Sequence, residues 1–226
     1  MVNVALIVAA GRGYRLGGPL PKQYLLLGGR PILRHTIEAL AMHKDIDAVQ
    51  VLIHPDDTTL YEEAVAGVEK LLPVQFGGAQ RQDSVRLGLE CIAALKPVNV
   101  LIHDAVRPFI GQHTISATLA ALNNSPAAIV GVPLADTLKR VEDGVVSGTV
   151  DRAGLWRAQT PQGFRYAEIL KAHRHAVRSA PETEFTDDAM IAEHAGLRVE
   201  MVLGNEDNFK ITNAADLARA EFLLRL

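Results

Sequence analysis

Short hydrophobic runs alternate with amphipathic stretches along most of the chain. Each run covers about five residues, a length that suits strands buried on both faces better than it suits helices. We predict strands at residues 4–8, 49–53, 98–102, 128–132 and 199–203, with a shorter one at 74–76.

The stretches between these runs repeat their hydrophobic residues with a helical period. We predict helices at residues 31–42, 60–71, 114–122, 166–177 and 187–194, another from the 77–84 segment to about residue 95, and a last one after Asn213, which is a good N-cap residue. The last helix is expected to bury Leu217, Ala220, Phe222 and Leu224. Strands and helices that alternate at this spacing predict an α/β fold with a doubly wound, mainly parallel sheet.

Residues 133–164 break this alternation, because they show no helical period. Within them, residues 138–142 and 145–150 flank Asp143-Gly144, a dipeptide typical of a tight hairpin turn. A lone hairpin is only marginally stable, so we expect a β-arm that packs on a second subunit. Trp156 and Phe164 are expected to pack at that interface. We predict one domain, residues 1–226, with residues 133–164 as this arm.

Composition excludes several classes of protein. The chain has 226 residues and 48% hydrophobic content, enough for one sizeable core. Its net charge of −3 argues against general binding of nucleic acid. Cys91 is the sole cysteine, so neither a disulfide nor a zinc cluster is expected. With no hydrophobic run of membrane length and no signal-peptide pattern, we expect a cytoplasmic protein without membrane contacts.

The first predicted strand leads directly into a cationic, glycine-rich loop. Its glycines, Gly11, Gly13, Gly17 and Gly18, permit positive φ and close approach of a ligand to backbone N–H groups. Five basic residues and no acidic residue precede Glu38, in a chain with 23 basic and 26 acidic residues overall. This local positive charge favours a site for several phosphates, and the alternative is a solvated loop without a ligand.

The spacing of this loop excludes two common phosphate-binding motifs. A dinucleotide-binding fingerprint requires a third glycine where Leu16 stands. A P-loop requires Lys followed by Ser or Thr where Pro19 and Leu20 stand.

Two more polar segments follow predicted strands. Gly77-Gly78 and then Ser84 come after one strand, and Asp104 and Arg107 come after another. Ligands of parallel α/β sheets bind beyond the carboxyl ends of the strands, so we expect both segments to share one site with the glycine-rich loop. By residue type alone, Ser84 could equally be a helix cap, and Asp104 could bind a metal or a ribose hydroxyl, or cap its loop.

A series of short motifs makes the chain similar to the 2-C-methyl-D-erythritol 4-phosphate cytidylyltransferases of the non-mevalonate isoprenoid pathway. In chain order, the motifs are AAGRGYR, PKQ, GGAQRQDSV, HDAVRP, ADTLKR, TVDRAGLW, QTPQGF, FTDDA and DNFKIT. HDAVRP and TVDRAGLW separate this family from the broader sugar nucleotidyltransferases, which share mainly the first motif. The resemblance extends from the first strand to the last helix and implies a Rossmann-like nucleotidyltransferase fold.

The resemblance also implies roles for individual residues. The catalytic residues would be Arg15, Lys22, Arg152 and Lys210. Binding of CTP would involve Ala9, Ala10, Gly11, Gly13, Gly78, Ala79, Ser84, Asp104 and Ala105. Binding of the second substrate would involve Asp104, Arg107, Thr137, Arg152, Thr160, Thr186 and Lys210. Mg²⁺ would be held mainly by the CTP phosphates, with Asp104 as a possible ligand. Some relatives have an acidic residue at the position of Ala79, which matters little if only its backbone is used.

The implied reaction transfers CMP from CTP to methylerythritol phosphate and releases pyrophosphate, after in-line attack of the acceptor phosphate on the α-phosphorus. The implied assembly is a homodimer joined through the 133–164 arm, in which Thr137 and Arg152 complete the neighbour's site. One alternative is another nucleotidyltransferase, acting on a different sugar phosphate or a pterin. Another is a nucleotide sensor without catalytic activity.

Overall fold

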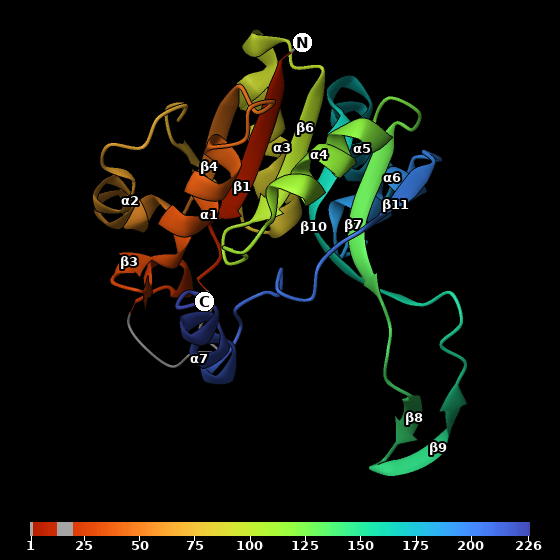
Figure 1. The fold of residues 1–226 in the computed structure, drawn as a ribbon. Coiled ribbons are helices and arrows are strands. Elements are labelled where there is room, and N and C mark those ends of the chain that lie inside the picture. The colour runs from red at the N-terminus through yellow and green to blue at the C-terminus, as the bar shows by residue number, and fades with distance from the viewer. Residues whose placement is uncertain (1, 13–19) are drawn as a thin grey trace.

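The computed structural model describes residues 2–12 and 20–226, and its centre is a seven-stranded sheet (Figure 1). The strands are β1 (Asn3–Ala9), β4 (Ala48–Ile53), β5 (Gln75–Phe76), β6 (Asn99–Asp104), β7 (Ala127–Pro133), β10 (Trp156–Arg165) and β11 (Val199–Leu203). Their order across the sheet is β11-β7-β10-β6-β1-β4-β5. Only β10 is antiparallel to its neighbours in this sheet, so the predicted mainly parallel α/β fold is confirmed.

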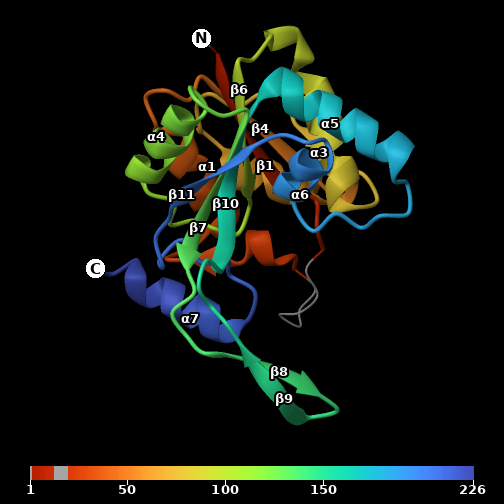
Figure 2. The ribbon, with the colours of Figure 1, turned by 90° about the vertical axis from the view of Figure 1, so that its right-hand side faces the viewer.

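Helices cover both faces of this sheet (Figures 1 and 2). One face packs on α1 (Ile32–Ala41), α2 (Thr58–Val65) and α4 (Gln112–Ala121), and the other on α3 (Arg81–Cys91), α5 (Tyr166–Ser179) and α6 (Asp188–His194). The helix predicted at residues 60–71 is shorter in the structure because Gly67 and Lys70 have φ of 76° and 61°, outside the helical range. No helix within the described residues is long and hydrophobic enough to cross a bilayer.

Several short elements complete the body of the molecule. The strands β2 (Leu26–Leu27) and β3 (Arg30–Pro31) pair as a small ribbon, and η2 (Lys22–Tyr24) and η3 (Pro55–Asp57) are single-turn helices. A further turn, η4 (Ile92–Leu95), extends α3 to the predicted end of that helix.

Strand β10 corrects the predicted extent of the arm. Residues 156–164 do not project from the body but lie in the sheet between β6 and β7. The sequence obscured this strand because proline is unusual in a central strand. Pro161 falls where the pairing of β10 with β7 shifts register, between Ala158 and Gln162, so it interrupts no regular ladder there. Phe164 is fully buried in the core, and the prediction that it packs at an interface is wrong.

The last helix, α7 (Ala214–Leu223), begins as predicted at Asn213. The side chain of Asn213 accepts a hydrogen bond from Asp216 N at 2.9 Å, and the Asp216 carboxylate accepts one from Asn213 N at 3.1 Å. The predicted burial is only partly right. Ala220 is fully buried, whereas Phe222 is 63% and Leu224 41% exposed.

Replacing Phe164 by alanine should lower the free energy of unfolding by about 3 to 5 kcal/mol, because it leaves a cavity in a closed part of the core. The matched control is Phe222→Ala, which removes the same side chain from a site that is 63% exposed. We expect that control to change stability by less than about 0.5 kcal/mol. Urea unfolding of both variants measures the difference, and equal losses would contradict the placement of β10.

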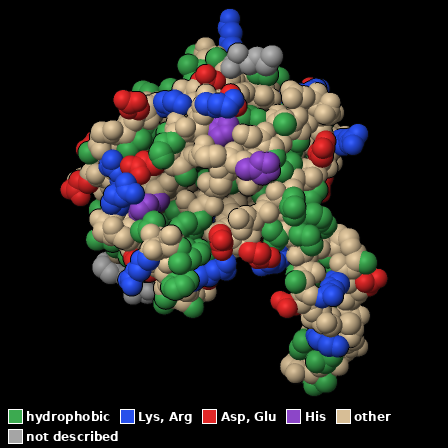
Figure 3. Space-filling model, in the orientation of Figure 1, with side chains coloured by type: hydrophobic (Ala, Val, Ile, Leu, Met, Phe, Trp, Pro, Cys, Tyr) green, Lys and Arg blue, Asp and Glu red, His purple; other side chains and the backbone are tan. Residues whose placement is uncertain are grey.

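The arm itself is a hairpin of β8 (Leu138–Glu142) and β9 (Val145–Val150), which pair in antiparallel fashion. Asp143 and Gly144 have φ of 49° and 82°, and such a two-residue turn with positive φ at both positions matches the twist of a hairpin. The arm leaves the body after β7, at the carboxyl edge of the parallel strands, and stands away from it with hydrophobic side chains at its outer end (Figure 3). Val141, Val145 and Val146 are 55%, 69% and 59% exposed.

Candidate functional site

A pocket of about 350 Å³ lies at the carboxyl edge of the sheet, where β1 and β6 end. The loops that follow these two strands line it together with the segment that leads into α3. This is the convergence that the sequence predicted for parallel strands. Among the predicted site residues, those that line the pocket are Ala9, Ala10, Gly11, Lys22, Gly78, Ala79, Ser84, Asp104, Ala105 and Lys210.

A buried glutamine side chain fixes the loop after β1. Gln23 is buried, and its Nε2 donates to the carbonyl oxygens of Ala9 at 2.7 Å and Gly11 at 3.2 Å. Gln23 and Lys22 are neighbours in η2, and both line the pocket. The predicted site residues Gly13 and Arg15 lie outside the described residues.

Most of the positive charge near the first loop does not face the pocket. Arg12 contacts Asp56 and Asp57 after β4, while Arg30 and Arg34 each bind Glu38 at 2.8 Å. Arginines that pair with acidic neighbours contribute little net potential. Among the described basic residues before Glu38, Lys22 is the one that lines the pocket.

The glycines before α3 are required by close packing. A Cβ atom at Gly77 would lie 2.4 Å from the Cβ of Ala10, and one at Gly78 would lie 2.4 Å from the Cβ of Asp83. Both distances are too short for a side chain, so glycine at position 77 lets this loop approach the loop after β1, and glycine at position 78 lets it pack against the start of α3.

Ser84 ties this loop to α3. Its Oγ accepts a hydrogen bond from Gly78 N at 3.0 Å and donates one to the carbonyl oxygen of Gln80 at 3.0 Å. The N-cap of α3 is Gln80, which forms a capping box with Asp83. The alternative that Ser84 caps the helix is therefore wrong, and Ser84 lines the pocket.

Asp104 is the acidic centre of the pocket. Its Oδ2 lies 3.1 Å from Lys210 Nζ and 3.1 Å from Arg107 Nε, and its Oδ1 lies 4.0 Å from Arg81 Nε. Burial raises the pKa of Asp104, but Lys210, Arg81 and Arg107 outweigh that effect and hold the pKa well below 3.8. The carboxylate is therefore ionised across the physiological range.

Arg107 and Thr160 support Asp104 from outside the pocket lining. Arg107 Nη1 donates to the carbonyl oxygen of Asn208 at 2.8 Å, and Asn208 Nδ2 donates to that of Thr160 at 2.7 Å. The Thr160 hydroxyl accepts a hydrogen bond from Asp104 N at 3.1 Å. These bonds fix β10 against the loop after β6.

Three further predicted residues also do not line the pocket. Thr137 and Arg152 are exposed in the segments that flank the arm hairpin. Thr186 is also exposed, and its hydroxyl contacts Met190 Sδ at 3.7 Å. Their predicted roles remain predictions.

His103 is buried behind Asp104 as a neutral imidazole. Its Nε2 lies 3.0 Å from the carbonyl oxygen of Arg107, which can only accept, so Nε2 carries the proton and Nδ1 accepts from the Thr160 hydroxyl at 2.9 Å. Burial lowers the pKa of His103 from 6.5 to about 4.

Because the pKa of His103 is lower in the folded state, the unfolded chain binds a proton first as pH falls, and stability is lost between pH 6.5 and about pH 4. We expect a loss of about 3 kcal/mol from this group over that window. Urea unfolding at several pH values measures it. A His103→Asn variant should show a flatter profile, and the exposed His113→Asn control should not differ from wild type.

The described residues of the pocket supply only part of a ligand set for a divalent cation. Within the described ranges, no group of three or more His, Cys, Asp or Glu side chains is placed to bind a metal. Among the described residues, Asp104 Oδ1 has only the 4.0 Å contact with Arg81 Nε. One carboxylate oxygen fits a magnesium ion that takes most of its other ligands from phosphates and water.

Known proteins resemble this chain along its length. Residues 3–226 match the family described as IspD, 2-C-methyl-D-erythritol 4-phosphate cytidylyltransferase. A protein of that name from Cereibacter sphaeroides is 47% identical over 226 residues, which are 100% of this chain and 98% of the relative. A relative from Paramagnetospirillum magneticum, named bifunctional enzyme IspD/IspF, is 60% identical, but the match covers 98% of this chain and 56% of the relative. The chain thus spans about half the length of the first curated relatives it matches.

Solved structures show the same fold. The 2-C-methyl-D-erythritol 4-phosphate cytidylyltransferase of Thermus thermophilus superposes with a TM-score of 0.80 at 36% identity, covering 100% of both chains. The 4-diphosphocytidyl-2C-methyl-D-erythritol synthase of Anaerococcus prevotii gives a TM-score of 0.86 at 28% identity, over 100% of this chain and 96% of the other.

Proposed function

Because the chain belongs to the 2-C-methyl-D-erythritol 4-phosphate cytidylyltransferase family, we propose that it transfers CMP from CTP to methylerythritol phosphate and releases pyrophosphate. The observation that carries the proposal is the pocket in which Lys22, the Gly78 segment and the Asp104–Lys210 pair meet. A nucleotide and a sugar phosphate need these three kinds of contact at one place.

The donor nucleotide is expected to lie between the loops after β1 and before α3. Ala10, Gly78, Ala79 and Ser84 line the pocket, and we propose that their backbone groups and the Ser84 hydroxyl pair with the edge of the cytosine. Backbone donors held by close packing recognise a base edge without side-chain rearrangement. Asp104 and Ala105 line the same pocket, and we propose that they contact the ribose and the acceptor.

The acceptor requires no general base. A phosphate monoester is already an anionic nucleophile near neutral pH, so its oxygen can attack the α-phosphorus directly and expel pyrophosphate. The pocket lining fits this chemistry, since it contains no histidine among the described residues. His103 lies behind the pocket and is neutral.

The protein must supply positive charge to this reaction, because two anionic substrates meet and negative charge builds up on the leaving pyrophosphate. Lys22 and Lys210 line the pocket and are proposed to face the phosphates, with Lys210 held beside the Asp104 carboxylate. Arg15 and the arm residue Arg152 are proposed as further cations on the basis of the family motifs. When bound, Mg²⁺ would neutralise triphosphate charge, held by the phosphates with Asp104 Oδ1 as the one protein ligand that fits among the described residues.

We further propose a homodimer in which the arm of each subunit reaches the other. The hydrophobic residues exposed on the hairpin and the position of Thr137 and Arg152 away from the pocket lining of their own chain support this arrangement. A cytoplasmic location is proposed as well, because the sole cysteine, Cys91, is an exposed free thiol that suits a reducing compartment.

A pyrophosphate-release assay tests the proposed function against its alternatives. Each of the four ribonucleoside triphosphates is combined with methylerythritol phosphate, with other sugar phosphates or with no acceptor, in the presence of Mg²⁺. We expect release only with CTP and methylerythritol phosphate. Release with UTP or GTP and another acceptor would favour a different nucleotidyltransferase, and CTP binding without release would favour a sensor.

A further inference from the structure

A fully buried carboxylate lies directly behind the pocket wall. Asp188, the first residue of α6, is 0% exposed, and its Oδ2 lies 2.7 Å from Nη2 of Arg81, which lines the pocket. We propose that Asp188, fixed by His173, is a positioning residue that holds Arg81 at the pocket edge and keeps it from closing onto Asp104. This inference rests on the proposed function.

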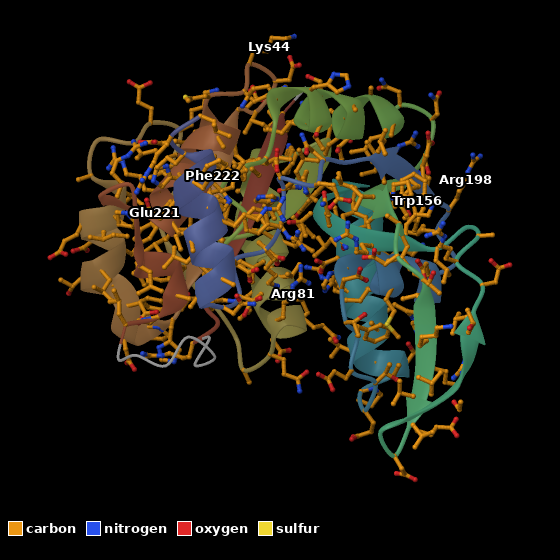
Figure 4. The ribbon with its side chains drawn as sticks, turned by 60° about the horizontal axis from the view of Figure 1, so that its bottom comes forward. Lys44, Arg81, Trp156, Arg198, Glu221 and Phe222 are labelled. Carbon is orange, nitrogen blue, oxygen red and sulfur yellow. The ribbon has the colours of Figure 1, made fainter. Side chains whose placement is uncertain are left out.

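Arg81 bridges two carboxylates from the first position of α3. Its Nη2 is 2.7 Å from Asp188, whereas its Nε is 4.0 Å from Asp104 Oδ1, beyond hydrogen-bond distance. The guanidinium therefore binds the carboxylate behind the wall more closely than the one in the pocket. Figure 4 shows Arg81 where side chains from several elements converge.

The carboxylate of Asp188 has contacts on both of its oxygens. Oδ1 lies 3.2 Å from His173 Nε2, and His173 is itself fully buried on α5. Arg81 and His173 outweigh the effect of burial and lower the pKa of Asp188, so the group is ionised. A buried charge without solvent must keep its partners, because losing them costs its full desolvation energy. The ion pair between Asp188 and Arg81 is therefore costly to break.

The backbone at the start of α6 is fixed as well. Gln162 Oε1 accepts hydrogen bonds from Asp188 N at 3.0 Å and Ala189 N at 2.9 Å, and its Nε2 donates to Asp187 Oδ2 at 2.8 Å. Gln162 belongs to β10 in the central sheet, so the first residue of α6 is anchored to the sheet itself.

The consequence concerns the two oxygens of Asp104. Oδ2 already contacts Lys210 and Arg107, both at 3.1 Å, while Oδ1 has Arg81 at 4.0 Å. Without Asp188, the guanidinium of Arg81 is free to move the remaining distance and bind Oδ1. Asp104 Oδ1 would then be shared with a guanidinium and would bind a substrate hydroxyl or a cation less strongly. Asp188 thus preserves the binding capacity of Asp104.

The test is a double-mutant cycle on kcat/KM for pyrophosphate release with CTP and methylerythritol phosphate. Asp188→Asn keeps the shape of the side chain and removes its charge. We expect kcat/KM to fall about 10- to 100-fold, as is common when a residue that orients a ligating side chain is replaced. Arg81→Gln removes the group on which Asp188 acts. In the double variant, the Asp188→Asn effect should vanish, so that its kcat/KM equals that of Arg81→Gln. Additive losses would overturn the proposal and indicate a purely structural role.

Glu193→Gln is the matched control. It removes a carboxylate charge from an exposed position of the same helix, so we expect kcat/KM within about twofold of wild type. Arg81→Lys provides a second test that does not depend on the folding of Asp188→Asn, because a lysine keeps the charge but cannot span two carboxylates. Wild-type kcat/KM in Arg81→Lys would overturn the proposal.

The wild-type reaction separates this inference from the proposed function. If wild type releases no pyrophosphate, the proposed function fails, and the same cycle is then measured as CTP affinity by calorimetry. Coupling between positions 81 and 188 in that measurement would retain the positioning role, and independent effects would remove it.

Discussion

Lys22→Ala is expected to lower kcat on the order of 10²- to 10³-fold, or about 3 to 4 kcal/mol of transition-state stabilisation, by analogy with the loss of one preorganised donor to a developing negative charge. Lys22 lines the pocket beside Gln23, which fixes the loop after β1. Charge on the leaving pyrophosphate grows only as the bond to the α-phosphorus breaks, so the KM for CTP should change much less than kcat. Steady-state pyrophosphate release over a range of substrate concentrations measures both constants.

The control for this variant is Lys44→Ala. Lys44 lies between α1 and β4, at the edge of the sheet opposite the pocket, and its side chain is 83% exposed (Figure 4). We expect kcat within about twofold of wild type, because isolated surface ion pairs such as Lys44–Asp45 contribute little. Turnover of Lys22→Ala that matches this control would remove Lys22 from the catalytic residues.

Arg152→Ala is expected to lower kcat/KM by about 10²-fold, although Arg152 does not line the pocket of its own chain. The proposed reason is that the arm delivers this guanidinium to the pocket of the second subunit, where it meets the acceptor phosphate. Arg140→Ala, which removes an exposed arginine from the hairpin itself, is the matched control and should retain activity.

Mixing two variant subunits tests whether Arg152 of one subunit acts in the pocket of the other. In a heterodimer of Lys22→Ala and Arg152→Ala subunits, an arm that serves the neighbour leaves one site with both defects and one site with none. Random reassociation should then restore about a quarter of wild-type activity, since half of the dimers have one intact site of two. If each site were completed by its own arm, every site would keep one defect and no activity would return.

Local signals predicted the parts of the fold that depend on local sequence. The β1 and β6 runs, the Asp143-Gly144 turn and the Asn213 cap all appear where residue type and period placed them. Each of these signals acts within a few residues, so no knowledge of tertiary contacts was needed. Because ligands of parallel sheets bind beyond the carboxyl ends of the strands, the same signals then predicted which loops line the pocket.

The parts that failed depend on distant neighbours. β10 contains Pro161, and its place in the sheet is set by β6 and β7 rather than by its own pattern. Phe222 has a helical position suited to burial, but no element of the described chain covers it. Local sequence also did not reveal that Arg30 and Arg34 pair with Glu38, so that Lys22 is the described basic residue of this segment that lines the pocket.

The contacts that hold Arg81 in place could not be predicted from local sequence either. Arg81 stands within the GGAQRQDSV segment, yet its partner Asp188 is 107 positions later. His173 and His175 stand two apart on one helix and do not face each other, so their spacing suggests no shared metal and gives no sign that His173 is the buried partner of Asp188. A buried polar side chain needs hydrogen-bond partners, but the sequence does not show which side chains are buried.

The position of β10 also has a consequence for how the protein is made. β6 and β7 follow one another in the chain, but they are joined in the sheet only through β10. While the ribosome is still synthesising residues before Trp156, the edges of β6 and β7 that later pair with β10 are unpaired, and each can recruit another polypeptide. The sheet closes only after Arg165 has emerged, so premature termination inside the arm should yield an aggregating fragment rather than a smaller folded protein.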